Sequence, residues 1–272
     1  MTIHSKILER ASAACVIKHI RPGWTLANLE PYPHGAGSPH KLISGDEFNF
    51  KIVRRMPAGA AADVYIAKDI EKGSEPLIKS AQGDKFIIKR YKRYVPLRAI
   101  EREYNILRHL NCIQSLQRCI PTDPVLIQTF DTRYLIYPYI PGTDASEHQK
   151  HILKEQSLEC LKQYIYNILR LANVCQTYAN ITHLDIKPNN MIYCPIKKKL
   201  SLIDFGTARY FSPTNRRKLM PISQPIGTEY YAAPEISDLN FNNTSDTYCI
   251  GRIIQYFWSD IVFCTDRVTN RY

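Results

Sequence analysis

The chain has 272 residues, with 36 Lys or Arg against 25 Asp or Glu, a formal net charge of +11 and a pI near 9.2. Its 44% hydrophobic content supports a sizeable core, and its length allows one or two domains. No uninterrupted apolar run is long enough to cross a bilayer, and Lys18 and His19 interrupt the apolar segment 11–20, after which no cleavage signature follows. We therefore expect a soluble, non-secreted, cytoplasmic chain without a transmembrane segment.

The eight cysteines contain no Cys-x-x-Cys pair, and most of them fall in apolar periodic segments. This usage is typical of buried, reduced thiols in a cytosolic protein. Cys112, Cys119 and His109 could be combined into a metal site, but their spacing is not that of a zinc motif. We therefore expect free thiols.

The first elements along the chain are an extension and a pair of strands. Residues 1–47 are punctuated strongly by the Pro- and Gly-rich stretch 31–39, and we interpret them as an N-terminal extension. Phe48–Val53 and Val64–Lys68 alternate and carry enough β-branched residues to predict strands. Between them lies the loop Pro57–Val64.

A helix is predicted next, over Leu97–Leu110, because its apolar residues recur at helical spacing with Glu103 beside the apolar stripe. Leu126–Ile127 and Tyr134–Tyr137 then predict strands. The amphipathic segment Ser157–Ala179 predicts a second long helix. It is followed by short strands over 191–193 and 200–203.

Two segments in the second half of the chain, His183–Asn190 and Asp204–Gly206, have the residues and the spacing of a phosphoryl-transfer site. Phosphoryl transfer needs correct positioning of the reactants and stabilisation of the charge on the phosphoryl oxygens. Mg²⁺ prefers hard oxygen ligands, so the Asp204 carboxylate and the Asn190 amide oxygen suit it beside the phosphates of ATP. A second carboxylate, Asp185, can then accept the proton of a substrate hydroxyl.

From about Phe48 to near Tyr256 the chain resembles the protein kinase superfamily, of the eukaryotic-like Ser/Thr type. The motifs that carry the resemblance occur in the family's order: Phe86–Lys89, Glu103, His183–Asn190, Asp204–Gly206, Gly227–Tyr230, Ala233–Glu235 and Ser245–Gly251. Alone, Asp204–Gly206 would be a turn and Lys89 a solvated strand residue. Chance does not easily place all of these motifs in one order, so the set favours a kinase.

The resemblance implies an α+β, two-lobed fold. A small β-rich N-lobe would occupy 48–137, a hinge 138–142, and a helical C-lobe 143–272. After Asp246 few residues remain for the helices that usually complete the C-lobe, so we expect a shortened lobe such as bacterial effectors or viruses employ, or a fragment. Arg267 or Arg271 would then pair with Glu235.

The resemblance also implies a role for each site residue. It implies catalytic roles for Asp185, Lys187, Asn190 and Thr228, ATP contacts for Gly59, Val64, Lys89, Glu103, Pro138, Ile140 and Asp204, and metal binding by Asn190 and Asp204. Lys89 would hold the α and β phosphates with Glu103 as its partner. Pro138 would offer its carbonyl and Ile140 its N–H to adenine, behind a bulky Tyr137. The implied cofactors are ATP and Mg²⁺, or Mn²⁺ in its place.

Two departures from the family pattern bear on mechanism. Only the middle glycine of the phosphate-covering loop, Gly59, is kept, while Pro57 and Ala62 replace the others, which predicts a stiffer loop and weaker ATP binding. Leu184 stands where many kinases have an arginine that pairs with a phosphate on the activation segment. We therefore predict activity without phosphorylation at Ser212, Thr214 or Ser223.

Three functions remain open, and the basic charge bears on the partners of each. The first is a Ser/Thr protein kinase, favoured by Lys187 followed by Pro188. The second is a pseudokinase that binds nucleotide or a partner without transfer. The third is a kinase that needs a protein or anionic activator. A solvated face is the favoured explanation of the positive charge, which also suits acidic protein substrates or anionic ligands, and no nucleic-acid-binding module accompanies it.

Overall fold

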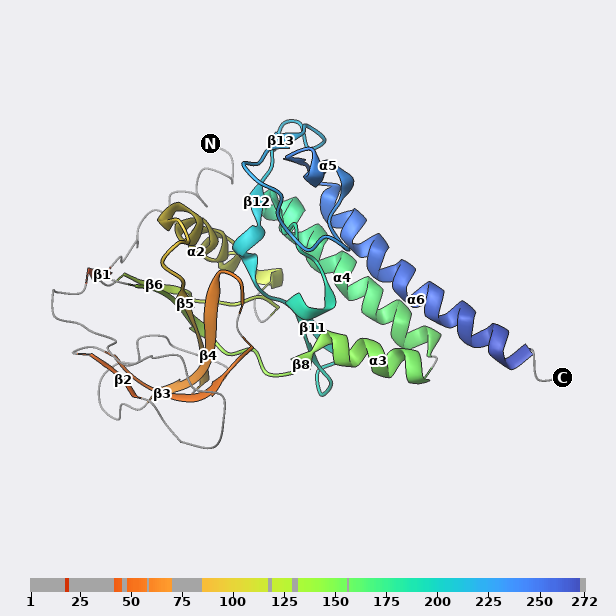
Figure 1. Ribbon diagram of the computed structural model, residues 1–272, viewed down its shortest axis with the longest axis horizontal. Coiled ribbons are helices and arrows are strands. Elements are labelled where there is room, and N and C mark those ends of the chain that lie inside the picture. The colour runs from red at the N-terminus through yellow and green to blue at the C-terminus, as the bar shows by residue number, and fades with distance from the viewer. Residues whose placement is uncertain are drawn as a thin grey trace. The chain divides into compact units, whose positions relative to one another are not determined.

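The computed structural model describes residues 18–19, 42–45, 48–57, 59–69, 85–116, 119–128, 132–155 and 157–269, and only the backbone at 18–19, 42–45, 48–51, 69, 128, 153, 155 and 258–269. It divides into two compact units (Figure 1). The first comprises residues up to Cys112 together with Pro121–Tyr139, and the second comprises Ile113–Ile120 and Ile140–Tyr272.

The first unit is built on one sheet with the strand order β1-β6-β7-β5-β4-β3-β2. Its strands are β1 (Lys18–His19), β2 (Leu42–Gly45), β3 (Phe48–Arg55), β4 (Ala62–Asp69), β5 (Lys85–Tyr91), β6 (Val125–Gln128) and β7 (Arg133–Pro138). All neighbours are antiparallel except β1 and β6. The predicted strands over 48–53, 64–68, 126–127 and 134–137 are confirmed. The edge strands β1 and β2 belong to the segment that we interpret as an extension, and its Pro-rich stretch 31–39 lies outside the described residues.

The core of this sheet follows the two-residue period of its strands. Successive side chains of a strand point to opposite faces, so alternate residues of β4, β5 and β7 share one face. The buried cluster on that face contains Tyr65, Ala67, Phe86, Ile88, Ile127, Tyr134 and Ile136. Its regularity fixes the register of β5, and therefore fixes the position at which Lys89 leaves the sheet.

Helix α2 (Leu97–Asn111) is the one α-helix described in the first unit, and it confirms the helix predicted over 97–110. Its apolar stripe is buried, as the spacing predicts, at Ile100, Tyr104, Leu107 and Leu110. Glu103 is also buried, at 3% exposure. A carboxylate is rarely buried without a partner, so this position calls for a cation.

The second unit is mainly helical. Its elements are the 3₁₀ helix η1 (Gln114–Leu116), β8 (Thr143–Asp144), α3 (Ala145–Glu155), α4 (Leu158–Ala179), β9 (Ile181–Thr182), the 3₁₀ helix η2 (Pro188–Asn190), β10 (Met191–Cys194), β11 (Lys199–Leu202), the 3₁₀ helix η3 (Phe205–Thr207), β12 (Arg209–Tyr210), β13 (Met220–Pro221), α5 (Pro234–Ser237), β14 (Asn240–Phe241) and α6 (Ser245–Thr269). The predicted helix over 157–179 and the strand pair over 191–193 and 200–203 are confirmed. Together the sheet-based first unit and the helical second unit confirm the α+β class.

Helix α4 carries the chain to the predicted catalytic segment. Ser157 caps its start by accepting a hydrogen bond from the Cys160 amide at 3.3 Å, and Asn180 ends it in a left-handed conformation (φ 53°). Both are residue types that suit these positions. The helix lies against α6, where the rings of Tyr164 and Phe257 meet edge to face at 5.7 Å.

No helix within the described ranges combines the length and the apolar character needed to cross a membrane.

Candidate active site

Lys89 and Glu103 form a buried ion pair in the first unit. The Lys89 Nζ atom, on β5, lies 2.6 Å from Glu103 Oε1 on α2, and the two side chains are 8% and 3% exposed. The hydroxyl of Tyr91 donates to the other carboxylate oxygen at 2.7 Å. Burial raises the pKa of Tyr91 well above its usual value, and the charge of Glu103 raises it further. Tyr91 therefore stays a donor, and it fixes the carboxylate that orients Lys89.

The loop before β4 is fastened to the segment that follows β5. Gly59 closes the loop through its amide, which donates to the Ala62 carbonyl at 3.2 Å. The Lys92 ammonium donates to the Gly59 carbonyl at 2.8 Å, and the Tyr94 hydroxyl donates to the Ala60 carbonyl. These bonds occupy carbonyl groups on a loop that lacks two of the family's glycines. The composition of the loop predicted its stiffness, whereas nothing in the sequence indicated the bonds from Lys92 and Tyr94.

Beyond the loop, the first residues of β4 carry Asp63 and Val64. Asp63 is buried and pairs with Arg55 at 3.1 Å and Arg90 at 3.0 Å, on the neighbouring strands β3 and β5. Three strands are therefore tied at the end next to the loop. Val64 pairs in register with Lys89, which sets it beside the lysine in the sheet.

The segment predicted as a hinge begins at the end of β7. Tyr137 is 5% exposed, and Pro138, the last residue of β7, pairs in register with Phe86. The next amide, that of Tyr139, donates to the Lys85 carbonyl at 3.0 Å. Ile140 is the first residue of the following stretch of the second unit. The adenine contacts assigned to Pro138 and Ile140 remain predictions.

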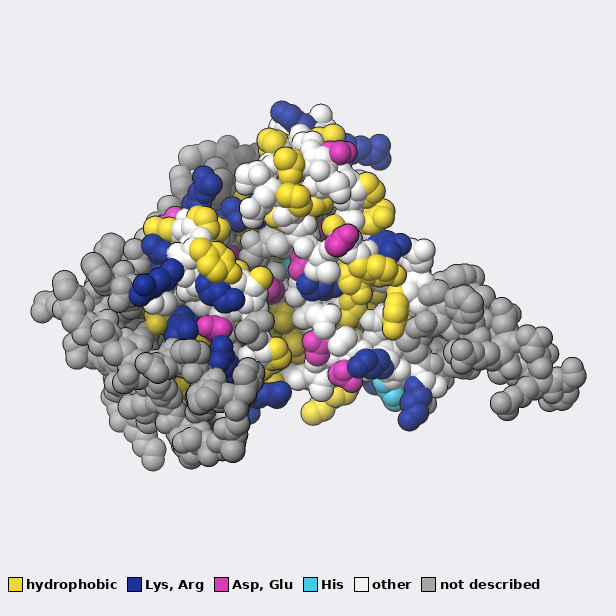
Figure 2. Space-filling view, viewed as in Figure 1, with side chains coloured by type: hydrophobic (Ala, Val, Ile, Leu, Met, Phe, Trp, Pro, Cys, Tyr) yellow, Lys and Arg dark blue, Asp and Glu magenta, His cyan; other side chains and the backbone are white. Residues whose placement is uncertain are grey.

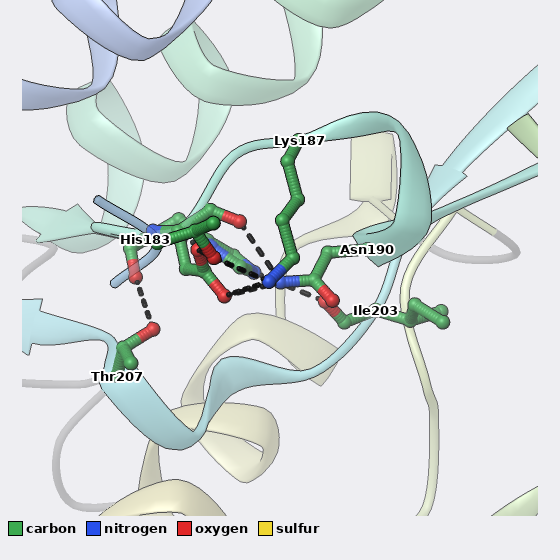
Figure 3. A network of polar contacts seen from close by, with 7 residues as sticks. His183, Lys187, Asn190, Ile203 and Thr207 are labelled. Carbon is green, nitrogen blue, oxygen red and sulfur yellow. Dashed lines mark hydrogen bonds and ion pairs between the residues drawn. The ribbon is translucent and has the colours of Figure 1, made fainter. Parts of the chain in front are cut away.

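In the second unit, the carboxylate of Asp185 gathers three side chains. Thr228 Oγ1 donates to Asp185 Oδ1 at 2.7 Å, Asn190 Nδ2 donates to Oδ2 at 2.7 Å, and Lys187 Nζ lies 3.0 Å from Oδ2. Lys187 also donates to Thr228 Oγ1 at 2.5 Å. Figure 3 shows the ends of Lys187 and Asn190 converging in this network. The structure thus brings together all four residues to which the sequence analysis assigned catalytic roles.

A second set of bonds, from residues far along the chain, fixes the backbone around Asp185. The Asp246 carboxylate accepts from the amides of His183 and Leu184, both at 2.8 Å. Thr207 Oγ1 donates to the His183 carbonyl at 3.0 Å, as Figure 3 shows. The expected bracing by Asp246 is present, whereas the bond from Thr207 was not predicted. A hydroxyl directly after the Asp-Phe-Gly segment was the available signal.

Phe205 and Ile203 hold the Asp204 segment against the same histidine. Phe205 is buried and meets the His183 ring edge to face at 4.8 Å. His183 Nε2 lies 3.1 Å from the Ile203 carbonyl, and the Ile203 amide donates to the Asn190 carbonyl at 2.9 Å. Asp204 itself is exposed and left-handed (φ 61°). The two residues assigned to the metal therefore lie on hydrogen-bonded neighbouring segments.

The donor chemistry of these two residues fits Mg²⁺. Asn190 Nδ2 donates both to the Asp185 carbonyl at 2.9 Å and to Asp185 Oδ2, which directs the amide oxygen of Asn190 away from Asp185. That oxygen and the exposed carboxylate of Asp204 are the hard ligands that Mg²⁺ prefers. Both residues could therefore hold the metal.

Leu184 lies in an apolar cluster rather than in a basic pocket. It has a positive φ of 65° and is 2% exposed. The cluster contains Leu184, Phe211, Ile222, Ala233, Ile236 and Phe241, and Met220, Ile226 and Ala232 pack against it. Most of its members come from the segment between Asp204 and Glu235, so apolar contacts hold that segment against the segment His183–Asn190.

Glu235 has a partner that the sequence analysis did not predict. Its Oε1 atom accepts a hydrogen bond from the Ser245 hydroxyl at 2.6 Å, at the start of α6. The arginines proposed as its partners, Arg267 and Arg271, lie where no side chains are described. The arginine pairing therefore stays a prediction.

The chain belongs to the protein kinase family, because the family model described as a protein kinase domain matches residues 50–271. The sequence is also similar to a probable serine/threonine-protein kinase of Dictyostelium discoideum, with 26% identity over 205 residues. The alignment covers 74% of this chain and 30% of that relative, so the chain spans only part of the relative's length. The expected superfamily and its α+β fold are thus confirmed.

Proposed function

We propose that the chain is a protein-serine/threonine kinase that transfers the γ-phosphoryl group of ATP to a protein hydroxyl. The observation that carries the proposal is the environment of Asp185. Thr228, Asn190 and Lys187 all contact one carboxylate, which is held by a backbone that Asp246 fixes. A carboxylate oriented in this way suits a base that receives the proton of the attacking hydroxyl.

The other residues have complementary roles in this proposal. Lys187, which is bonded to both Asp185 and Thr228, supplies a positive charge beside the hydroxyl that attacks. Lys89, oriented by Glu103, would hold phosphate oxygens. Mg²⁺, held by Asn190 and Asp204, would neutralise the charge of the phosphates. The Ser/Thr preference is supported by Lys187-Pro188 and by the name of the Dictyostelium relative.

We further propose that transfer does not require phosphorylation of the activation segment. The apolar surroundings of Leu184 support this proposal. A leucine at this position offers no positive charge to a phosphate on Ser212, Thr214 or Ser223. The segment also packs against the catalytic loop through apolar contacts that need no phosphate. An S212A/T214A/S223A variant is expected to keep most of the activity of the unmodified chain. An inactive variant with an unchanged melting temperature would refute this part of the proposal.

The experiment that tests the central proposal is phosphoryl transfer from radiolabelled ATP with Mg²⁺ to an acidic generic protein substrate. Asp185→Ala and Asp204→Ala serve as matched variants. We expect transfer by the unmodified chain and a loss of at least about 100-fold in each variant, since general base and metal contributions are of this order. Equal transfer by the Asp185→Ala variant would contradict the assignment of this site.

A second candidate is a pseudokinase that binds nucleotide without transfer, favoured by the loss of two loop glycines at Pro57 and Ala62. It predicts ATP binding in the same experiment without labelled product. A third, an activator-dependent kinase, predicts that transfer appears only when an acidic protein or anionic ligand is added. The presence of Lys89, Glu103, Asp185, Lys187, Asn190 and Asp204 together favours the enzyme.

A further inference from the structure

A cluster of three tyrosines and one arginine lies on the second unit, between the Gly227–Tyr231 segment and α6. The Arg252 guanidinium carbon lies 4.2 Å from the centre of the Tyr230 ring, and Arg252 Nε donates to the Tyr230 carbonyl at 2.9 Å. The rings of Tyr230 and Tyr231 meet edge to face at 5.1 Å. Burial raises the pKa of Tyr231. The neighbouring Tyr230 and Tyr256 raise that pKa further, and the charge of Arg252 lowers it. Tyr230, Tyr231 and Arg252 are thus direct neighbours, and Tyr256 lies four residues after Arg252 on the same helix, α6.

The cluster is attached directly to the catalytic aspartate. Thr228, which donates to Asp185 Oδ1 at 2.7 Å, is two residues before Tyr230. At Gly227 the backbone comes so close to the catalytic loop that an added Cβ would lie 2.5 Å from the Leu184 carbonyl oxygen. Two residues of chain span at most roughly 7 Å, so a peptide whose hydroxyl lies at Asp185 would carry its neighbouring residues past Tyr230, to which Arg252 is bonded.

The cluster is also partly open to solvent and carries a positive charge, with Arg252 and Tyr231 half-buried. Tyr230 is 48% and Tyr256 37% exposed. Figure 2 shows hydrophobic side chains, a class that there includes tyrosine, beside Lys and Arg side chains over α6. Arg252 Nη1 donates to Gln255 Oε1 at 2.5 Å, a neutral acceptor. Among the residues that the structure describes, no carboxylate pairs with Arg252, and Glu229 nearby on the chain is exposed.

We infer that Arg252, with Tyr230, Tyr231 and Tyr256, forms a subsite for an anionic side chain of the peptide substrate, close to the hydroxyl that is phosphorylated. An arginine carries several N–H donors in a fixed planar arrangement that matches carboxylate or phosphate oxygens. Tyrosine rings stack on its face and their hydroxyls can donate. The inference rests on the proposed function, and it gives that function a substrate class, peptides with Asp, Glu or phosphoserine near the acceptor.

A structural role for Arg252 is the competing explanation. Its bond to the Tyr230 carbonyl ties the Gly227–Tyr231 segment to α6. A residue that only ties this segment would affect all substrates alike, whereas a residue that reads charge would distinguish acidic peptides from neutral ones. The difference between peptides is therefore the readout that separates the two roles.

The experiment uses serine peptides in which one Asp is moved through the flanking positions, each matched by an Asn peptide. We expect kcat/KM of the unmodified chain to be about tenfold higher for the best Asp peptide than for its Asn match, mostly through KM, as one charge-assisted contact allows. Arg252→Gln should bring this ratio close to one, and Arg252→Lys should keep part of it. Lys197→Gln, which removes an exposed charge in the turn between β10 and β11, should keep all of it.

The binding of fluorescent versions of the same peptides is measured in parallel, so that the inference does not depend on turnover. Tighter binding of the Asp peptide without transfer, even when an anionic activator is added, would refute the proposed function and leave the subsite standing. Equal binding and equal kcat/KM for both peptides, or an unchanged ratio in Arg252→Gln, would overturn the inference. A phosphoserine peptide is tested as well. A preference for the Asp or the phosphoserine peptide over the Asn peptide supports an anion site, and the more strongly preferred of the two shows whether the subsite binds a carboxylate or a phosphate.

Discussion

The carboxylate of Asp246 accepts a hydrogen bond from the backbone amide of Leu184, which lies 62 residues earlier in the chain, at 2.8 Å. Its other oxygen accepts from the His183 amide at the same distance. Asp246 is 1% exposed, so this carboxylate is buried with two backbone donors. It supports a backbone that turns through a positive φ immediately before Asp185.

Asp246→Asn is therefore expected to lower the free energy of unfolding by about 2–4 kcal/mol. The asparagine NH2 group would face a backbone N–H, so one hydrogen bond would be lost, and the remaining bond would no longer be made to a charged acceptor. Activity should fall as well, since the positions of His183 and Leu184 determine that of Asp185. Chemical denaturation measures the first effect and transfer from ATP the second. Asp238→Asn, at an exposed site, is the control. An Asp246→Asn variant as stable as the control would show that the bonds contribute little.

Leu184→Arg tests the apolar cluster around the activation segment. A guanidinium without a partner is costly to bury, and Leu184 is surrounded by Phe211, Ile222 and Phe241. We expect this variant to lose about 2–4 kcal/mol of stability. Leu219→Arg, at a 51% exposed position of the same segment, should lose less than about 0.5 kcal/mol. Thermal melts of the two variants side by side would decide, and equal melting temperatures would contradict the assignment.

Local patterns in the sequence were sufficient for the regular elements. Helix α4 could be predicted because its apolar residues repeat at helical spacing and Ser157 caps it. The strands β10 and β11 could be predicted from two apolar runs on either side of a lysine-rich turn. The α+β class follows from the motif order together with these elements, and the structure and the family match confirm it.

Contacts between distant residues could not be predicted in the same way. Lys92 lies 33 residues after Gly59, and nothing in the basic run around it indicates a carbonyl partner. The neighbours of Leu184 come from separate places in the following segment, so its apolar cluster could not be predicted. The sequence showed only that a leucine stands where many kinases have an arginine. The predicted site residues were placed by resemblance, and their roles in the reaction remain predictions.

The bonds from Lys92 and Tyr94 to the loop lead to a prediction about nucleotide binding. The missing glycines keep the loop from approaching phosphate closely, whereas these bonds hold the Gly59 and Ala60 carbonyls and so reduce the number of loop conformations that a bound nucleotide must order. Each exposed bond contributes about 0.5–1 kcal/mol, so Lys92→Met combined with Tyr94→Phe should raise the Kd for ATP about five- to thirtyfold. Calorimetric titration measures it. The control combines Lys162→Met with Tyr166→Phe, both exposed on α4. An unchanged Kd would mean that the two bonds do not restrict the conformations of the loop.

Gly227→Ala and Gly251→Ala form a matched pair. Gly227 has φ +85°, and an added Cβ would lie 2.5 Å from the Leu184 carbonyl oxygen, whereas Gly251 in α6 has no atom within 4 Å of an added Cβ. We expect Gly227→Ala to cost about 2–3 kcal/mol and most of the activity, because Thr228 would be displaced from Asp185. Gly251→Ala should instead stabilise the helix by about 0.5–1 kcal/mol. Denaturation curves in which both variants shift in the same direction would contradict the geometry.

His148 makes the stability of the second unit depend on pH. Its ring stacks on that of Tyr193 with centroids 3.4 Å apart and planes at 6°. Burial lowers the pKa of His148 to about 4, and the neighbouring His151 adds to the shift. The folded state therefore keeps His148 neutral, while the unfolded chain takes up a proton below its ordinary pKa of 6.5. This contribution to stability is complete above pH 6.5 and is lost as the pH falls toward 4.

The expected outcome is a melting temperature that falls between pH 6.5 and pH 4 in the unmodified chain, and that falls less steeply in His148→Gln, because the variant has no proton to take up at this position. NMR titration of the imidazole gives the pKa directly. His151→Gln removes only the smaller cause of the shift, so it should raise the pKa of His148 slightly and leave it well below 6.5. An imidazole that titrates near 6.5 in the folded chain would mean that the stacked ring is open to water, and the slope of stability with pH would then have to come from other groups.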